Sequence, residues 1–268
     1  MKRKNITVNT MLDMKKQGEK ISMITCYDYT MAKLVSRSGI DVILVGDSGG
    51  MVQAGYDNTL PVTVDEMVYH TAAVRRGAPN MFIVADLPFL SYHVSKEKTI
   101  ENAGRLIQEG KANSVKLEGG SYFTELVSHL TACSIPVCGH LGMTPQSIHN
   151  FGGFRVQGRE EDKARRMVDD AKRIEDAGAF ALVLELVPRS LAKRICEALR
   201  IPVIGIGAGP DCDGQVLVIN DVLGLDDTFR PKMVKDYAGL AGKVITALDN
   251  YSQEVKQGDF PLDENSFE

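Results

Sequence analysis

The sequence predicts an α/β protein, a single-domain (β/α)8 TIM barrel, and three observations support this. Eight short apolar segments recur along the 268 residues, several of them bounded by glycine or proline. Most gaps between them have the length and composition of helices, as expected for parallel strands joined by helical crossovers. With 44% hydrophobic residues the chain can bury one large core, and barrels of this kind commonly reach this length as one domain.

The elements follow one another in a regular order. Strands are predicted at residues 21–28, 41–47, 81–88, 114–120, 136–142, 179–188, 202–209 and 215–225. Helices are predicted in the gaps, at residues 30–39, 63–76, 96–110, 122–133 and about 160–177. The gap GPDCDG after the seventh strand is too short for a helix.

The two ends of the chain are expected to add to this barrel. An N-terminal helix precedes it, and a C-terminal helical extension begins at about Lys232. Residues 1–268 are expected to form one domain, with a polar tail over about residues 252–268. A doubly wound open sheet is the alternative, but it favours a glycine-rich turn after the first strand, where this chain has CYDYT.

Charge and cysteine usage exclude several classes of protein. The formal net charge is −4, and the basic start MKRK is too short to form a nucleic-acid surface alone. The five cysteines form no CxxC pair, which fits neither a disulfide framework nor a zinc site. We find no signal-peptide core and no apolar run near the roughly 18 residues that span a bilayer. We therefore expect a cytoplasmic protein without membrane or nucleic-acid partners.

Polar residues gather where the predicted strands end, and in such barrels the carboxyl ends of the strands form the active-site face. These residues are Asp47, Ser48, Asp86, Lys116, Glu118, His140 and Glu185. Lys116 and Glu118 are two residues apart on one strand, so their side chains point the same way, with Leu117 opposite. A structural salt bridge at a strand end explains this pair about as well as a catalytic role does.

Three of these acids suggest a metal site. Asp47, Asp86 and Glu118 come from neighbouring strands and offer only oxygen ligands, which suit Mg²⁺. The alternative is that Asp47 and Asp86 accept hydrogen bonds from backbone N–H groups in the following loops.

Glu185 lies within ALVLELVP, with leucine on both sides. Burying an acid in a strand is costly, which favours a role as general base. The alternative is a structural glutamate bonded to backbone or paired with an arginine. His140 is equally compatible with a structural and a catalytic role. The glycines of GIGAG, residues 205–209, lack the spacing of a phosphate-binding fingerprint and favour a tight turn.

Several longer motifs resemble the ketopantoate hydroxymethyltransferase family: GDSGG, VADLPF, VKLEGG, GHLGMTPQS, FGGFRVQGR, LVLELVP, IGIGAG and the FPLDENSF tail. The resemblance implies a Mg²⁺-dependent transfer of a one-carbon unit from 5,10-methylenetetrahydrofolate to 3-methyl-2-oxobutanoate. The product would be 2-dehydropantoate (ketopantoate), an intermediate of pantothenate biosynthesis. The resemblance also implies a barrel assembled as a homo-oligomer, often a decamer.

The resemblance further assigns roles to individual residues. The metal ligands fall on Asp47, Asp86 and Glu118, and the proton acceptor falls on Glu185. The contacts to the keto acid fall on Asp47, Ser48, Asp86 and Lys116.

Two positions depart from what related barrels have. The family usually has leucine where this chain has Gly49, which is expected to loosen the turn after Asp47. Cys138 in CGH is reminiscent of the catalytic cysteine of isocitrate lyases, but Ile135, Pro136 and Val137 precede it, so a core cysteine is expected.

Two other functions compete with the transferase. A Mg²⁺-dependent C–C lyase of the isocitrate lyase or phosphoenolpyruvate mutase kind would share the barrel and its acidic site. The LPVT and GFRVQGR segments match the transferase instead. A non-catalytic metabolite-binding barrel is disfavoured by the complete set of acidic and basic strand-end residues.

Overall fold

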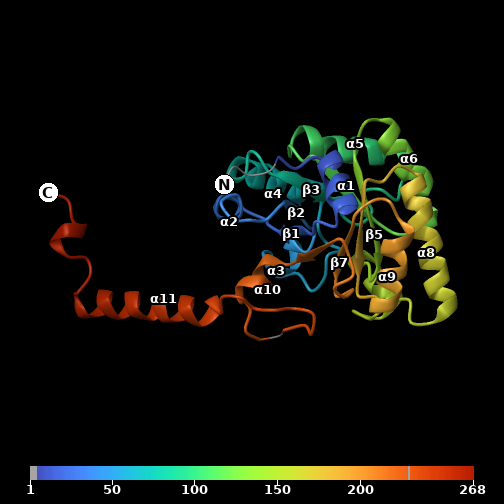
Figure 1. Cartoon of the computed structure of the whole chain (residues 1–268). Helices are drawn as coiled ribbons and strands as arrows, with labels where there is room; N and C mark the ends of the chain where they lie inside the picture. Colours follow the sequence, from blue (N-terminus) through green and yellow to red (C-terminus); the bar gives the residue numbers. More distant parts are fainter. Residues whose placement is uncertain (1–4, 229) are drawn as a thin grey trace. The chain divides into compact units, whose positions relative to one another are not determined.

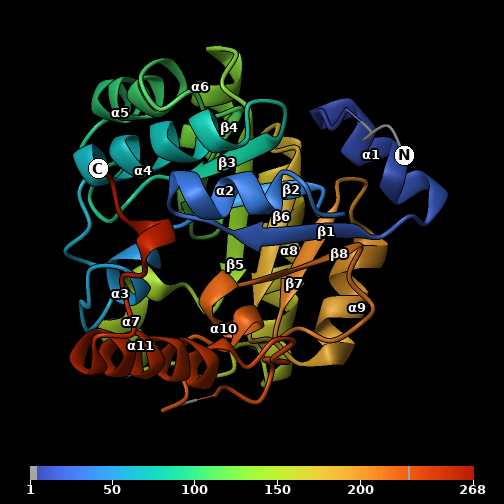
Figure 2. The ribbon, with the colours of Figure 1, turned by 90° about the vertical axis from the view of Figure 1, so that its left-hand side faces the viewer.

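The computed structural model describes residues 5–228 and 230–268, and the chain divides into two compact units, Met1–Leu217 and Val218–Glu268. In the first unit eight parallel strands close into a barrel in chain order, with β8 pairing with β1 (Figures 1 and 2). The strands are β1 (Ile21–Thr25), β2 (Val42–Val45), β3 (Phe82–Asp86), β4 (Ser114–Glu118), β5 (Val137–Gly142), β6 (Ala181–Glu185), β7 (Val203–Ile206) and β8 (Gly214–Leu217). The predicted (β/α)8 barrel is confirmed.

Helices follow most strands and cover the outside of the barrel (Figure 2). The longer ones are α2 (Tyr29–Val35), α4 (Val64–Gly77), α5 (Lys96–Gln108), α6 (Thr124–Ala132), α8 (Glu161–Asp176) and α9 (Arg189–Ala198). Short helical turns lie in the loops that follow β2, β4 and β5: α3 (Gly49–Val52), η1 (Ser121–Phe123), η2 (Pro145–Ser147) and α7 (Ile148–Phe151). Sequence determines some helix starts directly, since Thr63 and Glu66 form a capping box at the start of α4.

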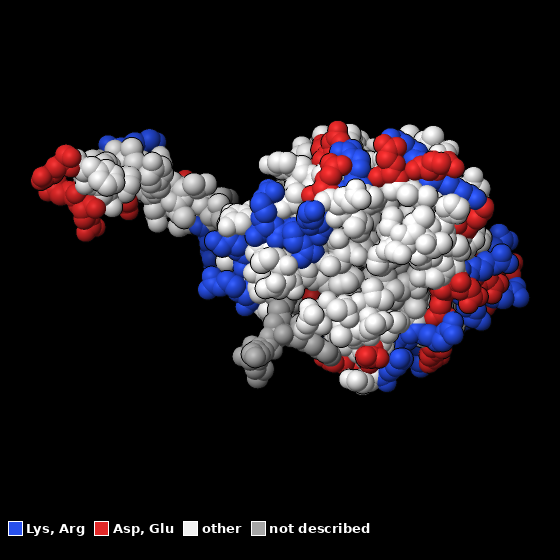
Figure 3. Space-filling model, turned by 90° about the horizontal axis from the view of Figure 1, so that it is seen from above, with Lys and Arg blue, Asp and Glu red and all other residues white. Residues whose placement is uncertain are grey.

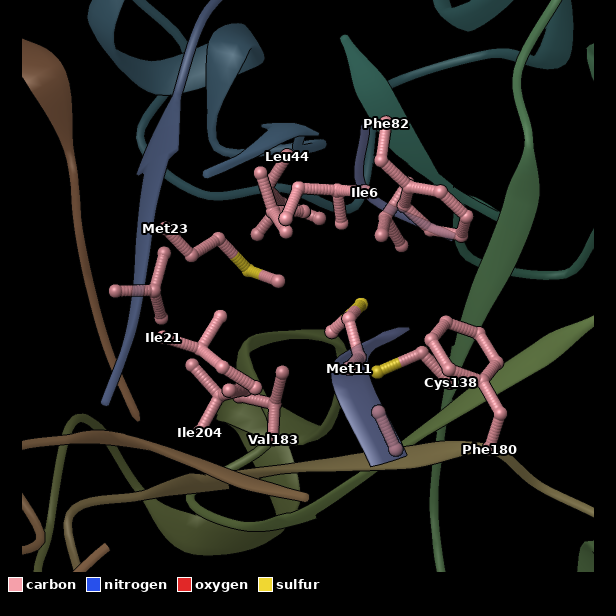
Figure 4. Packing of buried hydrophobic residues seen from close by; sticks show 14 of the residues in the cluster. Ile6, Met11, Ile21, Met23, Leu44, Phe82, Cys138, Phe180, Val183 and Ile204 are labelled. Carbon is pink, nitrogen blue, oxygen red and sulfur yellow. The ribbon is translucent and has the colours of Figure 1, made fainter. Parts of the chain in front are cut away.

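The N-terminal helix α1 (Val8–Gln17) contributes to the barrel core. It starts at the Thr7 cap and ends at Gly18, which has the left-handed conformation that favours glycine. Its Met11 and Met14 are almost completely buried, and Figure 4 shows Met11 among inward-pointing strand side chains such as Ile21, Phe82 and Val183. The helix therefore packs its apolar side chains into the core cluster inside the barrel.

The second unit is helical and begins earlier than expected. Only residues 215–217 of the predicted strand 215–225 belong to β8, and α10 (Ile219–Leu223) follows, so that prediction is wrong beyond Leu217. The apolar run VLVINDVLGL fits either structure, and Gly224 ends a helical turn in the left-handed conformation. The predicted helical extension is α11 (Leu240–Gln257), followed by η3 (Asp263–Asn265).

The surface carries both signs of charge. Along the upper and right-hand edges of the barrel unit in Figure 3, acidic and basic residues alternate. Within the part of the chain that the structure describes, no helix is long and apolar enough to cross a membrane.

Candidate active site

The barrel brings six of the seven predicted strand-end residues to the carboxyl ends of β2 to β6. Asp86, Glu118 and Glu185 are the last residues of β3, β4 and β6, and Asp47 follows β2 by two residues. All six are buried: Asp47, Asp86, Lys116, Glu118 and His140 are 3% exposed, and Glu185 is 9% exposed. Such a concentration of buried charge is typical of a functional site.

Lys116 stands between two of the carboxylates. Its Nζ is 3.1 Å from Asp86 Oδ1 and 3.9 Å from Glu118 Oε1. Asp86 and Lys116 are register partners on adjacent strands, which explains the shorter of the two distances. The side chains of Lys116 and Glu118 therefore do lie on the same face of β4, and the ion pair is fully inside the barrel.

His140 connects this group to Glu185. Its Nδ1 is 3.2 Å from Lys116 Nζ and 3.3 Å from Glu118 Oε1, while its Nε2 is 3.3 Å from Glu185 Oε2. If Lys116 donates to Nδ1, the ring proton is on Nε2 and faces Glu185. The partner of Glu185 is therefore an imidazole rather than the arginine that the structural alternative suggested.

The pKa values show how the buried charges influence one another. Burial raises the pKa of Asp47 well above its usual value, and the charges of Asp86 and Glu118 raise it further. Burial likewise raises the pKa of Asp86, although Lys116 opposes this. Burial also acts to raise the pKa of Glu118, but the neighbouring His140 and Lys116 and the backbone N–H of Gln146 lower it overall. Burial alone would lower the pKa of Lys116, but the three carboxylates raise it overall.

Sequence reasoning missed Gln146, which lies in η2 and is buried. Its side-chain Nε2 donates to Asp47 Oδ2 at 2.8 Å, and its backbone N–H donates to Glu118 Oε2 at 3.0 Å. The residue is in a loop rather than at a strand end, so the pattern used to find the other residues did not select it.

The carboxylates share a pattern that bears on metal binding. One oxygen of each accepts an N–H: Asp47 Oδ2 and Glu118 Oε2 from Gln146, and Asp86 Oδ2 from the backbone of Asp47 at 3.1 Å. Asp86 Oδ1 and Glu118 Oε1 are buried with no hydrogen-bond partner, because Lys116 approaches Asp86 at ion-pair distance without hydrogen-bond geometry. Buried carboxylate oxygens without partners suit a small divalent cation, which prefers oxygen ligands.

The ligands are not preassembled, however. Among residues 5–228 and 230–268, no group of three or more His, Cys, Asp and Glu side chains forms a cluster that could hold a metal ion. The Lys116 ammonium partly neutralises the carboxylates in this arrangement. The donor chemistry therefore fits a hard cation, whereas the positions of the side chains do not yet form its coordination sphere.

Ser48 lies beside this group and is held by an aromatic residue. Its Oγ is 2.8 Å from the Tyr27 hydroxyl. Gly49 belongs to α3, and a Cβ atom at this position would lie 2.9 Å from Cδ1 of Tyr27. The absent side chain at position 49 thus leaves space for the tyrosine ring, rather than providing a flexible turn.

Two predictions about non-catalytic residues can also be compared with the structure. Cys138 is fully buried in the core cluster, and burial raises the pKa of its thiol to about 12, so it is a neutral core residue as expected. In GIGAG, Gly207 and Gly209 have φ values of 63° and 87°, which only glycine adopts readily. The described residues between β7 and β8 contain no helix. This is the expected tight turn.

A cavity of about 700 Å³ opens near residues that precede the strands, at the amino end of the barrel. Its cation, Arg75, donates to the carbonyl oxygens of Pro79, Met81 and Lys111 and to the side chain of Asn113. The acidic and imidazole groups lie at the opposite end, so we place the candidate active site there.

Comparison with known sequences identifies the family to which the chain belongs. Residues 5–263 match the family model described as ketopantoate hydroxymethyltransferase. A relative from Moorella thermoacetica, named 3-methyl-2-oxobutanoate hydroxymethyltransferase, is 56% identical over 265 residues, covering 99% of this chain and 98% of the relative. A relative of the same name from Syntrophus aciditrophicus is 54% identical over 266 residues, covering 99% of this chain and 98% of the relative.

Solved structures share the fold at low identity. Phosphoenolpyruvate phosphomutase from Streptomyces platensis subsp. rosaceus has a TM-score of 0.63 and 11% identity, covering 94% of this chain and 88% of that one. Phosphonopyruvate hydrolase in complex with oxalate and Mg²⁺ has a TM-score of 0.60 and 12% identity, covering 97% of this chain and 93% of that one. These likenesses concern the fold alone, whereas the sequence matches favour the transferase over the lyase and the non-catalytic barrel.

Proposed function

This chain belongs to the ketopantoate hydroxymethyltransferase family, and we propose that it transfers a hydroxymethyl group to 3-methyl-2-oxobutanoate, forming ketopantoate for pantothenate biosynthesis. The proposed one-carbon donor is 5,10-methylenetetrahydrofolate and the proposed metal is Mg²⁺. One observation beyond family membership carries the proposal. Five consecutive strands direct buried acidic, basic and imidazole side chains to one end of the barrel.

The reaction needs a base near the substrate. Glu185 removes the proton from C3 of the keto acid, and the electrons of the C–H bond form the enolate. His140, 3.3 Å away, orients the Glu185 carboxylate. The enolate carbon then bonds to the methylene carbon of the folate as one C–N bond to that carbon breaks and its electrons return to nitrogen. Water supplies the hydroxyl oxygen as the second C–N bond breaks, the folate nitrogens take up the two protons released, and tetrahydrofolate leaves.

The remaining residues bind the substrate and stabilise charge. Lys116 places positive charge where the enolate oxygen develops, and Ser48, held by Tyr27, binds the substrate carboxylate. Asp47, Asp86 and Glu118 hold the cation, and Asp47 and Asp86 also contact the keto acid. A bound divalent cation supplies Lewis-acid polarisation of the keto group.

Exchange of the C3 hydrogen with D₂O tests the proposal without the folate. We expect ¹H NMR to show exchange that requires Mg²⁺ and stops when the metal is chelated. Glu185→Gln should slow it by about 10²–10⁴-fold, the usual contribution of a general base. Glu197→Gln, on α9, is the matched control and should exchange at the wild-type rate.

Exchange by Glu185→Gln at the wild-type rate would exclude Glu185 as the base. Adding 5,10-methylenetetrahydrofolate to the wild-type protein should then yield ketopantoate. Exchange without this product would mean that a different one-carbon donor is used.

We also propose that the chain forms a homo-oligomer, because the family that it resembles often assembles as a decamer. Helix α11 supports this, because none of its residues is buried. Its apolar side chains recur at helical spacing and are 45–62% exposed: Val244, Ile245, Leu248, Tyr251 and Val255. A continuous exposed apolar stripe is typical of an interaction surface.

Sedimentation velocity of the full chain tests this second proposal. We expect an oligomer that Leu248→Lys weakens and Asn250→Lys, outside the apolar stripe, does not. A monomeric wild-type chain at micromolar concentration would contradict it.

The five free thiols support a cytoplasmic location, which fractionation of cells expressing the protein would check.

A further inference from the structure

Gln146 makes hydrogen bonds with all of its donors and with its side-chain acceptor. Besides the bonds to Asp47 and Glu118, Nε2 donates to the Leu87 carbonyl at 3.0 Å, and Oε1 accepts from the Tyr92 hydroxyl at 2.7 Å. Gln146 is 7% exposed and Tyr92 is 3% exposed. A buried amide with every hydrogen bond made is fixed in one orientation.

Tyr92 determines which way the amide faces. Its hydroxyl has one proton, and the donation to Gln146 Oε1 is shorter than the alternative donation to the Glu118 carbonyl at 3.3 Å. The hydroxyl oxygen can meanwhile accept the backbone N–H of Glu118 at 3.3 Å. A flipped amide would set its oxygen against Asp47 and the Leu87 carbonyl, which repel it.

The consequence concerns the two carboxylates that Gln146 joins. Asp47 belongs to the loop after β2 and Glu118 ends β4, and a single residue binds one oxygen of each. The second oxygen of Glu118 is left without a hydrogen bond. Fixing one oxygen restricts where the other can point, and this is how groups behind a metal ligand orient it.

We propose that Gln146, oriented by Tyr92, is a positioning residue that sets Asp47 and Glu118 for binding a divalent cation. This inference rests on the proposed function, because it takes the two carboxylates as metal ligands. Gln146 itself contacts neither substrate nor cation. Its effect is on the affinity for the metal, so it can be measured without turnover.

The experiment measures Mn²⁺ affinity of the full-length protein by the EPR signal of free Mn²⁺, with neither substrate present. Gln146→Met keeps the length of the side chain and the backbone N–H but loses the amide. We expect Mn²⁺ to bind about 10–100-fold more weakly, the usual effect of losing a group behind a metal ligand. Tyr92→Phe keeps the ring but loses the hydroxyl, and we expect a smaller loss in the same direction. Gln108→Met, exposed on α5, is the matched control.

The possible results separate this inference from the proposed function. If Gln146→Met and Tyr92→Phe both fold and both bind Mn²⁺ with the wild-type affinity, the inference is overturned, but the proposed metal site is not. A wild-type chain that does not bind Mn²⁺ would overturn the metal of the proposed function and the inference with it. Circular dichroism reports whether each variant is folded, and if Gln146→Met does not fold, Tyr92→Phe alone decides the question.

Discussion

The two ends of the barrel are built from the same strands but have opposite chemistry. On β5, Cys138 packs in the apolar core and His140, two residues later, contacts Lys116 and Glu118. On β6, Val183 is in the core and Glu185, two residues later, contacts His140. Two residues along a strand are about 6.6 Å and keep the side chain on the same face. On each of these strands, therefore, the apolar layer and the charged layer are only two residues apart.

This difference shows where stability and chemistry reside. The apolar layer, together with Met11 of α1, removes hydrocarbon from water and stabilises the fold (Figure 4). The charged layer is desolvated and retains buried oxygens without hydrogen bonds, which destabilises the fold. Substitutions in the apolar layer should therefore change stability alone, whereas substitutions in the charged layer should change both stability and activity.

The largest expected effect follows from removing the cation in the charged layer. Lys116→Met leaves buried carboxylates unpaired, and we expect it to lower the free energy of unfolding by about 3–5 kcal/mol at neutral pH. Mg²⁺ should restore part of this loss if it binds the same carboxylates. Urea unfolding with and without Mg²⁺ measures both effects, with the exposed Lys98→Met as control. Wild-type stability in Lys116→Met would mean that the charged layer does not depend on its lysine.

The apolar layer should respond in stability alone. Met11→Ala creates a cavity in the core and should lower the free energy of unfolding by about 2–5 kcal/mol. The value of kcat/KM should change little in the protein that remains folded, because Met11 belongs to the apolar layer. Urea unfolding and initial rates check this, with the exposed Leu34→Ala as control. A large loss of kcat/KM without loss of stability would contradict the division into two layers.

A smaller effect has the opposite sign. Asp47→Asn should raise the free energy of unfolding by about 0.5–2 kcal/mol at neutral pH while abolishing activity. Because burial raises the pKa of Asp47 in the folded chain, the folded state binds this proton more tightly than the unfolded state does. Wild-type stability therefore falls as the pH rises from the unfolded pKa through the folded pKa.

Urea unfolding at several pH values tests this sign. The advantage of Asp47→Asn over the wild type should be fully present above the folded pKa and should shrink as the solution is acidified. A variant that is less stable than the wild type at neutral pH would show that the Asp47 carboxylate stabilises the fold.

The smallest expected effect is at Gly49. A Cβ in Gly49→Ala would meet the Tyr27 ring at 2.9 Å, and the displaced hydroxyl would lose its hydrogen bond to Ser48. We expect about 1 kcal/mol lower stability and a roughly two- to tenfold higher KM for the keto acid. Steady-state kinetics and thermal unfolding measure these changes.

A double substitution checks the cause. Tyr27→Phe added to Gly49→Ala should raise KM little further, because the hydrogen bond to Ser48 is already lost. Two independent, additive increases in KM would show that position 49 does not act through Tyr27.

Much of the fold could be predicted because it depends on local patterns. The eight apolar segments and the helices between them indicated the barrel, since alternating strands and helices favour parallel pairing. The eighth strand was predicted too long because a short apolar run fits strand and helix equally. The residues after Leu217 instead form α10, which ends at Gly224 in a left-handed backbone conformation that only the folded chain shows.

The sequence by itself determined the eight strands, the buried charges at their carboxyl ends and the family to which they belong. Strand periodicity alone indicates that Lys116 and Glu118 share a face. Only the tertiary structure decided how those charges are held, because their partners come from distant loops. Gln146 binds Asp47 across 99 residues of sequence, and Tyr27 fills the space that Gly49 leaves open. A local pattern encodes the direction in which a side chain points, but closing the barrel determines which side chains it meets.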